Sequence, residues 1–173
     1  GSSVAVARGD VAFALGTDTA GSGRVPAGFN NLVGLKPTPG RVSNAGVLPA
    51  CRSVDCVSVF ALTVADAAQV LAVMEGPDRA DSYSAFAPGP ARLAPGSSGL
   101  RVGIPRAPVF AVGDPVGYAA AFDTAVARLA ALGHAAVAID FAPLLAVAEL
   151  LYGGPWIAER HAVVQPLLDA DPG

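Results

Sequence analysis

Residues 16–27 read G-T-D-T-A-G-S-G-R-V-P-A, and this stretch decides how the first part of the chain folds. It follows an apolar run at residues 11–15, which is typical of a buried strand that ends at a glycine. The glycines of the stretch let the backbone turn sharply and approach a neighbouring group closely, because glycine has no Cβ. A proline near its end is tolerated in the first turn of a helix. We therefore predict a strand over residues 11–16, a tight turn, and a short helix over residues 24–31.

The turn contains a candidate nucleophile, Ser22. Successive backbone N–H groups in such a turn can point at one spot and stabilise a negatively charged oxygen. A serine hydroxyl beside that spot is suited to nucleophilic attack. The same residues also fit a plain strand-to-helix connection in which Ser22 only caps the following helix. The residues by themselves leave both interpretations open.

The longer pattern is more specific. The string at residues 16–27, together with F-N-N-L-V-G-L-K-P-T at residues 29–38, resembles the core of the amidase signature family, whose members hydrolyse amides with a Ser–cis-Ser–Lys triad. The resemblance implies that Ser22 is the nucleophile. It implies an oxyanion hole formed by the backbone N–H groups of Thr19, Ala20, Gly21 and Ser22. It also implies an α/β protein, with an α/β/α domain built on a large mixed sheet, and a reaction that needs no metal or organic cofactor.

Two members of the family's triad have no counterpart in these 173 residues. The cis-serine precedes the nucleophile in the family and would fall just before Gly1, and the lysine lies further upstream. Ser2 and Ser3 do not align with the cis-serine. The single lysine of the chain, Lys36, belongs to the string after the nucleophile. We therefore expect residues 1–173 to be the central and later portion of an amidase-signature domain. Without the N-terminal portion, we expect this partial domain to be inactive by itself.

A second string, L-Y-G-G-P-W-I-A-E-R at residues 151–160, places aromatic and polar side chains in an apolar region. The planar fork of an arginine suits a carboxylate, because it donates two parallel hydrogen bonds. An ordinary loop with a core tryptophan also fits these residues. Together with V-L-P-A-C-R-S-V-D-C-V-S-V-F-A-L-T-V-A-D-A at residues 47–67, however, the string is similar to the allophanate hydrolases within the family. This resemblance implies that Tyr152, Gly153 and Arg160 bind the substrate, allophanate (urea-1-carboxylate).

Two other functions stay open at this point. The chain also fits another amidase-signature hydrolase of small amides, and it fits a catalytically dead remnant that serves as a structural or binding module. A Ser–His–Asp triad is not indicated, because Ser22 lies in A-G-S-G-R rather than in the G-x-S-x-G turn of the α/β-hydrolases.

Composition narrows the class of protein and its partners. The length suits one domain, and 53% hydrophobic with 14% charged residues excludes a disordered chain. The net charge of −3 without a basic cluster argues against a nucleic-acid partner, and the broken apolar runs argue against a membrane span. Cys51 and Cys56, without a secretory cue, predict reduced thiols and a cytoplasmic location. The resemblance implies a functional link to a urea carboxylase, and we expect the full-length protein to be a homo-oligomer.

The rest of the chain alternates between helical and extended patterns. Residues 41–58 are predicted to be a loop and residues 81–99 an irregular connection. A strand–helix–strand alternation over residues 100–139 predicts a βαβ unit. The predicted strands are 32–35, 100–105 and 135–139, and the predicted helices are 63–75, 116–132, 141–151 and 157–168.

Overall fold

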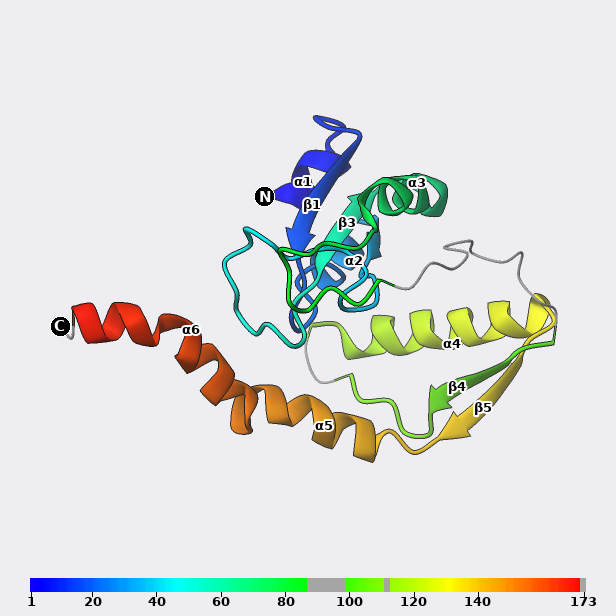
Figure 1. The fold of residues 1–173 in the computed structure, drawn as a ribbon. Coiled ribbons are helices and arrows are strands. Elements are labelled where there is room, and N and C mark those ends of the chain that lie inside the picture. The colour runs from blue at the N-terminus through cyan, green and yellow to red at the C-terminus, as the bar shows by residue number, and fades with distance from the viewer. Residues whose placement is uncertain (87–98, 111–112, 172–173) are drawn as a thin grey trace. The chain divides into compact units, whose positions relative to one another are not determined.

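A three-stranded antiparallel sheet organises the N-terminal part of the chain (Figure 1). In the computed structural model, which describes residues 1–86, 99–110 and 113–171, its strands are β1 (Phe13–Thr17), β2 (Val33–Leu35) and β3 (Val57–Ala61). They lie in the order β1-β3-β2, so β3 is the central strand. The chain divides into two compact units, one formed by residues 1–92 and 151–173 and the other by residues 93–150.

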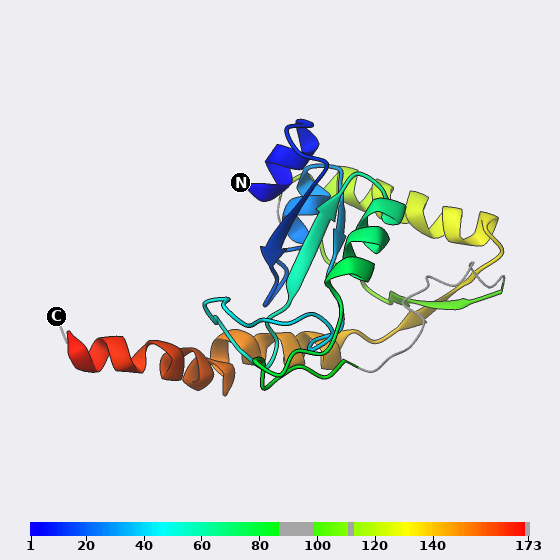
Figure 2. The ribbon, with the colours of Figure 1, turned by 45° about the horizontal axis from the view of Figure 1, so that its top comes forward.

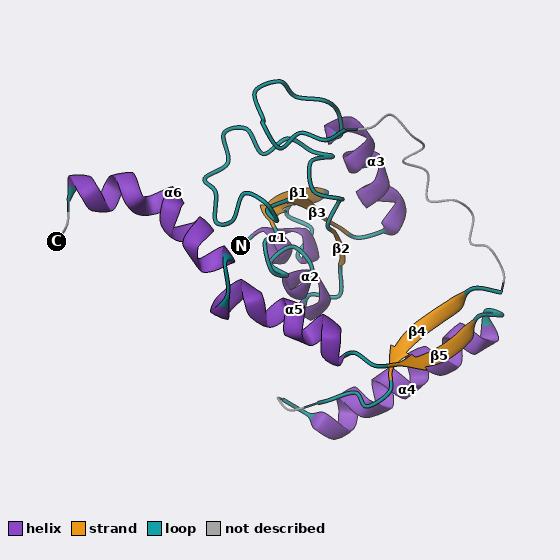
Figure 3. Ribbon diagram, turned by 60° about the horizontal axis from the view of Figure 1, so that its bottom comes forward, coloured by secondary structure: helices purple, strands orange, loops and turns teal. Residues whose placement is uncertain are grey.

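Helices cover both faces of this sheet, because its residues alternate between the two sides. Phe60 of β3 packs with Val6 of α1 (Ser2–Ala7) and Ala27 of α2 (Val25–Phe29) on one face. Its neighbours in β3, Val59 and Ala61, pack against α3 (Val64–Met74) on the other face. Figures 2 and 3 show α1 and α2 on one side of the sheet and α3 on the other. The unit is therefore an α/β/α arrangement, and the predicted α/β class is confirmed.

The central strand β3 departs from the sequence prediction. The pattern predicts a loop over residues 41–58 and no strand directly after it, which is wrong for Val57–Ala61. Four of these five residues are buried, since β3 is paired on both edges and covered on both faces. Such a strand lacks the alternation of polar and apolar residues that marks a half-exposed strand. The short run V-S-V-F-A, with a serine inside it, therefore carries little strand signal.

Thr63 caps the N-terminus of α3. The backbone N–H of Asp66 donates a 3.1 Å hydrogen bond to Oγ1 of Thr63, and the Thr63 hydroxyl donates to the Asp66 carboxylate at 2.7 Å. These contacts satisfy one of the N–H groups that have no partner within the first turn of a helix. The helix ends at Met74, one residue before its predicted end at residue 75.

The second unit contains the predicted βαβ arrangement. Strands β4 (Arg101–Pro105) and β5 (Ala135–Ile139) pair in parallel, and α4 (Pro115–Ala131) connects them. Gly133 follows α4 with a φ of 80°, as expected for a glycine just beyond a helix end.

The last two helices are α5 (Ala142–Gly153) and α6 (Trp156–Ala170), close to their predicted bounds. Residues 81–86 are irregular as predicted, and residues 87–98 of that connection lie outside the described residues. None of the helices in the described ranges combines the length and the apolar character that crossing a bilayer requires.

Close backbone contacts join the turn after β1 to the neighbouring strand β2. A Cβ built on Gly34 of β2 would overlap the carbonyl oxygen of Gly23 and would lie 2.7 Å from the Cβ of Ala27. A Cβ on Gly23 would lie 2.6 Å from the Cβ of Ser58, which belongs to β3. Only glycine at these two positions lets the turn, α2 and the sheet approach so closely.

Gly34→Ala is therefore expected to destabilise the chain by about 1–3 kcal/mol, because the obstacle is backbone that cannot move away freely. Gly28→Ala is the matched control, since Gly28 lies in α2 with open space around it. That change should be neutral or should stabilise by up to about 1 kcal/mol, because alanine favours helix. Urea unfolding of both variants measures the difference. Equal effects at the two positions would contradict the packing account.

Candidate active site

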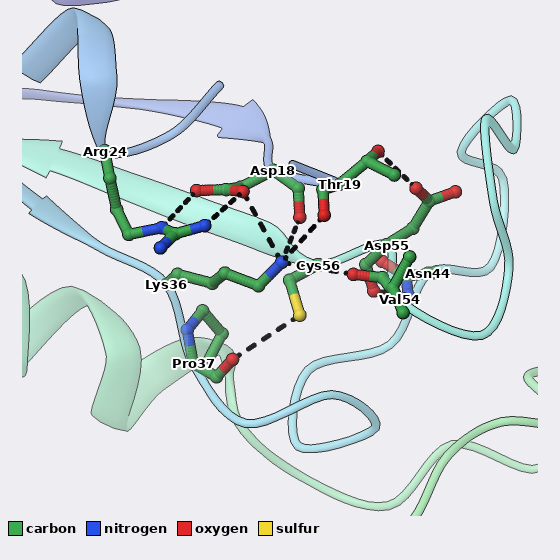
Figure 4. A network of polar contacts seen from close by, with 9 residues as sticks. All are labelled: Asp18, Thr19, Arg24, Lys36, Pro37, Asn44, Val54, Asp55 and Cys56. Carbon is green, nitrogen blue, oxygen red and sulfur yellow. Dashed lines mark hydrogen bonds and ion pairs between the residues drawn. The ribbon is translucent and has the colours of Figure 1, made fainter. Parts of the chain in front are cut away.

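A buried carboxylate, Asp18, lies directly after β1 and anchors the turn that contains Ser22 (Figure 4). Its side chain is fully buried, and its backbone N–H donates to the carbonyl of Cys56 at 2.8 Å. The guanidinium of Arg24 donates two hydrogen bonds to the carboxylate, at 2.9 and 3.2 Å, and Nζ of Lys36 lies 3.4 Å from it. A buried charge is tolerated when it is paired and hydrogen-bonded in this way.

These contacts change the acidity of the Asp18 carboxyl. Burial alone raises its pKa, because it disfavours the charged form. The hydrogen bond from Arg24 and the positive charges of Lys36 and Arg24 act in the opposite direction and prevail, so the pKa of Asp18 lies below its ordinary value. The carboxyl therefore stays ionised at neutral pH and binds both cations.

Lys36, the single lysine of the chain, holds the backbone of the same turn. Its Nζ donates to the carbonyl oxygens of Asp18 at 2.5 Å, Val54 at 3.1 Å and Thr19 at 3.5 Å. In a trans peptide the C=O and the following N–H point in opposite directions. Since the carbonyls of Asp18 and Thr19 face Lys36, the N–H groups of Thr19 and Ala20 face away from it.

The turn leaves Ser22 exposed. The carbonyl of Gly21 accepts hydrogen bonds from the N–H groups of Arg24 at 2.9 Å and Val25 at 2.7 Å, which start α2. The same peptide geometry then directs the N–H of Ser22 away from α2. The N-cap of α2 is Arg24, without a side-chain capping bond, so the alternative in which Ser22 caps this helix is wrong.

The four N–H groups predicted to form an oxyanion hole belong to Thr19, Ala20, Gly21 and Ser22. Within the described residues, none of them donates a hydrogen bond to another part of the protein. Gly21 has a φ of 149°, a conformation that a side chain would strain. A turn with several donors not used internally can receive an anionic oxygen.

Asp55 ties this turn to the loop that precedes β3. The hydroxyl of Thr19 donates to one oxygen of the Asp55 carboxylate at 2.5 Å, across 36 positions of sequence. The other oxygen accepts the N–H groups of Ala50 and Cys51, both at 2.9 Å. Asp55 and Lys36 are thus two positioning residues that the sequence patterns do not single out. Lys36 follows the apolar run at residues 32–35, whereas no local pattern marks Asp55.

The predicted substrate-binding residues lie where α5 meets α6. Tyr152 is near the end of α5, Gly153 is its last residue, and Arg160 is in α6. The guanidinium carbon of Arg160 lies 5.2 Å from the centre of the Tyr152 ring, a cation–π distance. Tyr152 is 68% exposed, and Arg160 is half-buried. The structure thereby brings together Tyr152 and Arg160.

The cysteines and acidic side chains form no metal site in the residues that the structure describes, where no three His, Cys, Asp or Glu side chains are grouped to hold a metal ion. Cys51 and Cys56 are both free and buried. Burial raises the pKa of each thiol, and the neighbouring carboxylate of Glu159 raises that of Cys51 further.

Asp18→Asn is expected to cost about 3 kcal/mol of stability at pH 7, because it leaves two cations without their buried partner. The folded-state pKa of Asp18 is lowered, so its stabilisation is present above the unfolded pKa, which is 3.8, and is lost as the pH falls through the folded value. The difference between wild type and variant should therefore shrink below pH 3.8. Urea unfolding at pH 7 and at lower pH measures it.

Asp10→Asn is the matched control for this prediction. Asp10 pairs with Arg8 at 3.2 Å, and both side chains are more than half exposed. Loss of this ion pair should change the free energy of unfolding by no more than about 0.5 kcal/mol. A constant deficit of Asp18→Asn down to pH 2 would show that its charge is not the cause.

Comparison with known proteins places this site in a family. The model of the family described as Amidase matches residues 1–170. The chain is 48% identical to the urea amidolyase of Saccharomyces cerevisiae over 99% of its own length and 9% of that protein. It is 51% identical over 109 residues to a glutamyl-tRNA(Gln) amidotransferase subunit of Myxococcus xanthus, covering 61% of this chain and 22% of that one.

A solved structure agrees with these matches. The Kluyveromyces lactis allophanate hydrolase superposes with a TM-score of 0.90 at 45% identity, over 99% of this chain and 28% of that one. The chain thus spans a minor part of the proteins that it matches. Since the family model covers almost every residue, including the Ser22 turn and the Tyr152–Arg160 pair, the chain belongs to the amidase family.

Proposed function

We propose that this chain is the part of an allophanate-hydrolysing amidohydrolase that supplies the nucleophile, the oxyanion hole and the groups that bind the substrate carboxylate. The observation that carries the proposal is the exposed Ser22 in a turn whose N–H groups are not used inside the protein. The names of the urea amidolyase and the allophanate hydrolase that the chain resembles support the choice of substrate.

The proposed reaction is a Ser–cis-Ser–Lys hydrolysis. A lysine accepts the proton of the cis-serine, and the cis-serine in turn accepts the proton of Ser22. The Ser22 oxygen attacks the amide carbonyl, the C–N bond breaks, and the nitrogen takes up a proton and leaves as ammonia. Water then hydrolyses the acyl-enzyme and restores the serine. Each N–H of the oxyanion hole is expected to stabilise the transition state by about 3 kcal/mol.

Arg160 and Tyr152 are proposed to hold the other end of the substrate. Allophanate carries a carboxylate next to its urea group, and a guanidinium binds a carboxylate through two parallel hydrogen bonds. The position of Arg160 over the Tyr152 ring supports this role, because the ring restrains the guanidinium and leaves its N–H groups free to donate. Gly153, beside the tyrosine, is proposed to let the substrate approach the backbone.

The functional partner, the cellular compartment and the larger domain are also proposals. The match to a urea amidolyase supports a functional link to a urea carboxylase, which would produce the allophanate. The two free thiols support a reducing compartment such as the cytoplasm. Residues 1–173 are proposed to be one part of a larger amidase domain.

A hydrolase of another small amide is the second candidate. The match to the amidotransferase favours it, because 109 residues of this chain are 51% identical to a protein with a different name. A test of substrate charge separates the two functions, since allophanate has a carboxylate for Arg160 to bind and a neutral amide does not.

The 173-residue chain by itself is expected not to hydrolyse allophanate at an enzymatic rate. Its single lysine donates to three carbonyl oxygens and faces Asp18, so it is not free to act as the base. An ammonia-release assay on the purified chain measures this. Activity that disappears in Ser22→Ala would refute the expectation and would require another base within the chain.

Arg160→Ala is expected to lower kcat/KM for allophanate by at least about tenfold, since hydrogen bonds to charged groups contribute roughly 1.5–3 kcal/mol each. The measurement uses a K. lactis allophanate hydrolase in which this chain replaces the matching segment. Arg160→Lys should recover little, because an ammonium lacks the planar fork. Tyr152→Phe should cost less, because it removes one neutral hydrogen bond and keeps the ring.

A neutral amide without a carboxylate is the control substrate. It should be hydrolysed poorly by the parent enzyme, and Arg160→Ala should affect it far less than allophanate. Equal losses for both substrates would make Arg160 a structural residue, and the function would then be that of an amidase with another preference.

A further inference from the structure

The carboxylate of Glu159, next to Arg160 in α6, is bound entirely by the loop of residues 50–55. One oxygen accepts the backbone N–H of Ser53 at 2.8 Å, and the other accepts the Ser53 hydroxyl at 2.7 Å and the thiol of Cys51 at 3.4 Å. The indole N–H of Trp156, one turn earlier in α6, donates to the same Ser53 hydroxyl at 3.1 Å. These four hydrogen bonds fasten the first turns of α6 to the loop.

The opposite side of the loop is fastened to the Ser22 turn. Asp55 is 4% exposed, accepts the N–H groups of Ala50 and Cys51 with one oxygen, and accepts the Thr19 hydroxyl with the other. A continuous path of polar contacts therefore runs from Thr19 through Asp55 and the loop to Glu159. Both ends of this path adjoin groups proposed to touch the substrate: the oxyanion hole at one end and Arg160 at the other.

Arg160 stays free of the Glu159 carboxylate. The two are consecutive residues of α6, and the side chains of consecutive helical residues do not face each other. The Glu159 carboxylate instead accepts hydrogen bonds from Ser53 and Cys51. Burial by itself raises the pKa of Glu159. The bonds from Ser53 outweigh this effect, so the pKa lies below its ordinary value. In the described part of the chain, no ion pair involves Arg160. Its guanidinium lies over the Tyr152 ring instead.

We propose that Glu159 is a positioning residue that sets the distance between Arg160 and the Ser22 turn, and thereby makes the site selective for short amides that carry a carboxylate. The inference rests on the proposed function, because it needs Arg160 to bind the carboxylate. A substrate held at both ends has to match the distance between its two binding groups. A fixed distance accepts allophanate and rejects a homologue that is one methylene longer.

The first test asks whether Glu159 holds α6 in the 173-residue chain. Trp156 is the single tryptophan of the chain, so its fluorescence reports on the contact directly. Glu159→Gln should shift the emission to longer wavelength and increase quenching by acrylamide. The Cys51 thiol should react faster with a disulfide reagent in a Cys56→Ser background. The matched control is Asp169→Asn, also in α6, whose exposed carboxylate accepts a hydrogen bond from Gln165 in the same helix. The control should change neither signal.

The second test asks whether this contact sets selectivity, in the same K. lactis enzyme that contains this chain. Glu159→Gln should raise KM for allophanate about tenfold and change kcat by less than about twofold, because binding geometry is altered and the nucleophile is not. The ratio of kcat/KM for allophanate to that for succinamate, a longer carboxylated amide, should fall. Hydrolysis of a neutral amide should be unchanged. Ser53→Ala should produce a smaller change in the same direction, because the Ser53 N–H still binds Glu159.

Three results would overturn the proposal: unchanged fluorescence and thiol reactivity, an unchanged KM, or an equal loss for the neutral amide. Thermal unfolding of each variant separates the last result from simple loss of the fold, and Ser53→Ala replaces Glu159→Gln if the latter does not fold.

Arg160→Ala separates this inference from the proposed function. If Arg160→Ala lowers kcat/KM for allophanate specifically while Glu159→Gln has no effect, only the positioning role fails. If Arg160→Ala has no specific effect, the proposed function fails as well.

Discussion

The burial of one carboxylate, Asp18, is the constraint on which the site depends. A charge without solvent has to be compensated nearby, and here the compensation comes from Arg24 at the start of α2 and from Lys36 at the end of β2. The backbone of Asp18 is in turn bonded to Cys56, next to β3. One residue thus connects all three strands and the first helix after β1. Packing alone would leave the small, glycine-rich turn free to adopt several conformations, and the paired charges select one.

The same network determines the directions of the backbone C=O and N–H groups in the turn. Lys36 donates hydrogen bonds to carbonyl oxygens of the turn, and the N–H groups at the start of α2 donate to the carbonyl oxygen of Gly21. Because each peptide is planar and trans, fixing the carbonyls also fixes the opposite direction of the N–H groups. Catalysis by an oxyanion hole requires donors that are oriented before the reaction begins. In the proposed oxyanion hole, Lys36 meets that requirement through backbone geometry.

Local chemistry made much of this fold predictable. The strand before the turn, the capped helix α3 and the βαβ unit follow from apolar periodicity and from residues such as Thr63 and Gly133, whose roles depend on near neighbours. The Ser22 turn was predictable for the same reason, and the resemblance to a family added the roles of its residues. Strand β3 was not, because a strand buried on both faces and both edges has no polar alternation to reveal it. Asp55 and Glu159 act across 36 and 106 positions of sequence, and no local pattern encodes such contacts.

The difference between the features that local patterns predict and those that they miss has a physical origin. Burial of apolar side chains stabilises the fold wherever it occurs, so the packing of the sheet and its helices does not require particular distances between polar groups. A substrate that is held at both ends instead requires a particular distance, and only directional contacts fix a distance. The hydrogen bonds at Asp55, Ser53 and Glu159 are directional, and they lie between the two groups proposed to touch the substrate. The apolar layers therefore stabilise the fold of this chain, whereas its selectivity is proposed to come from the polar path between Thr19 and Glu159.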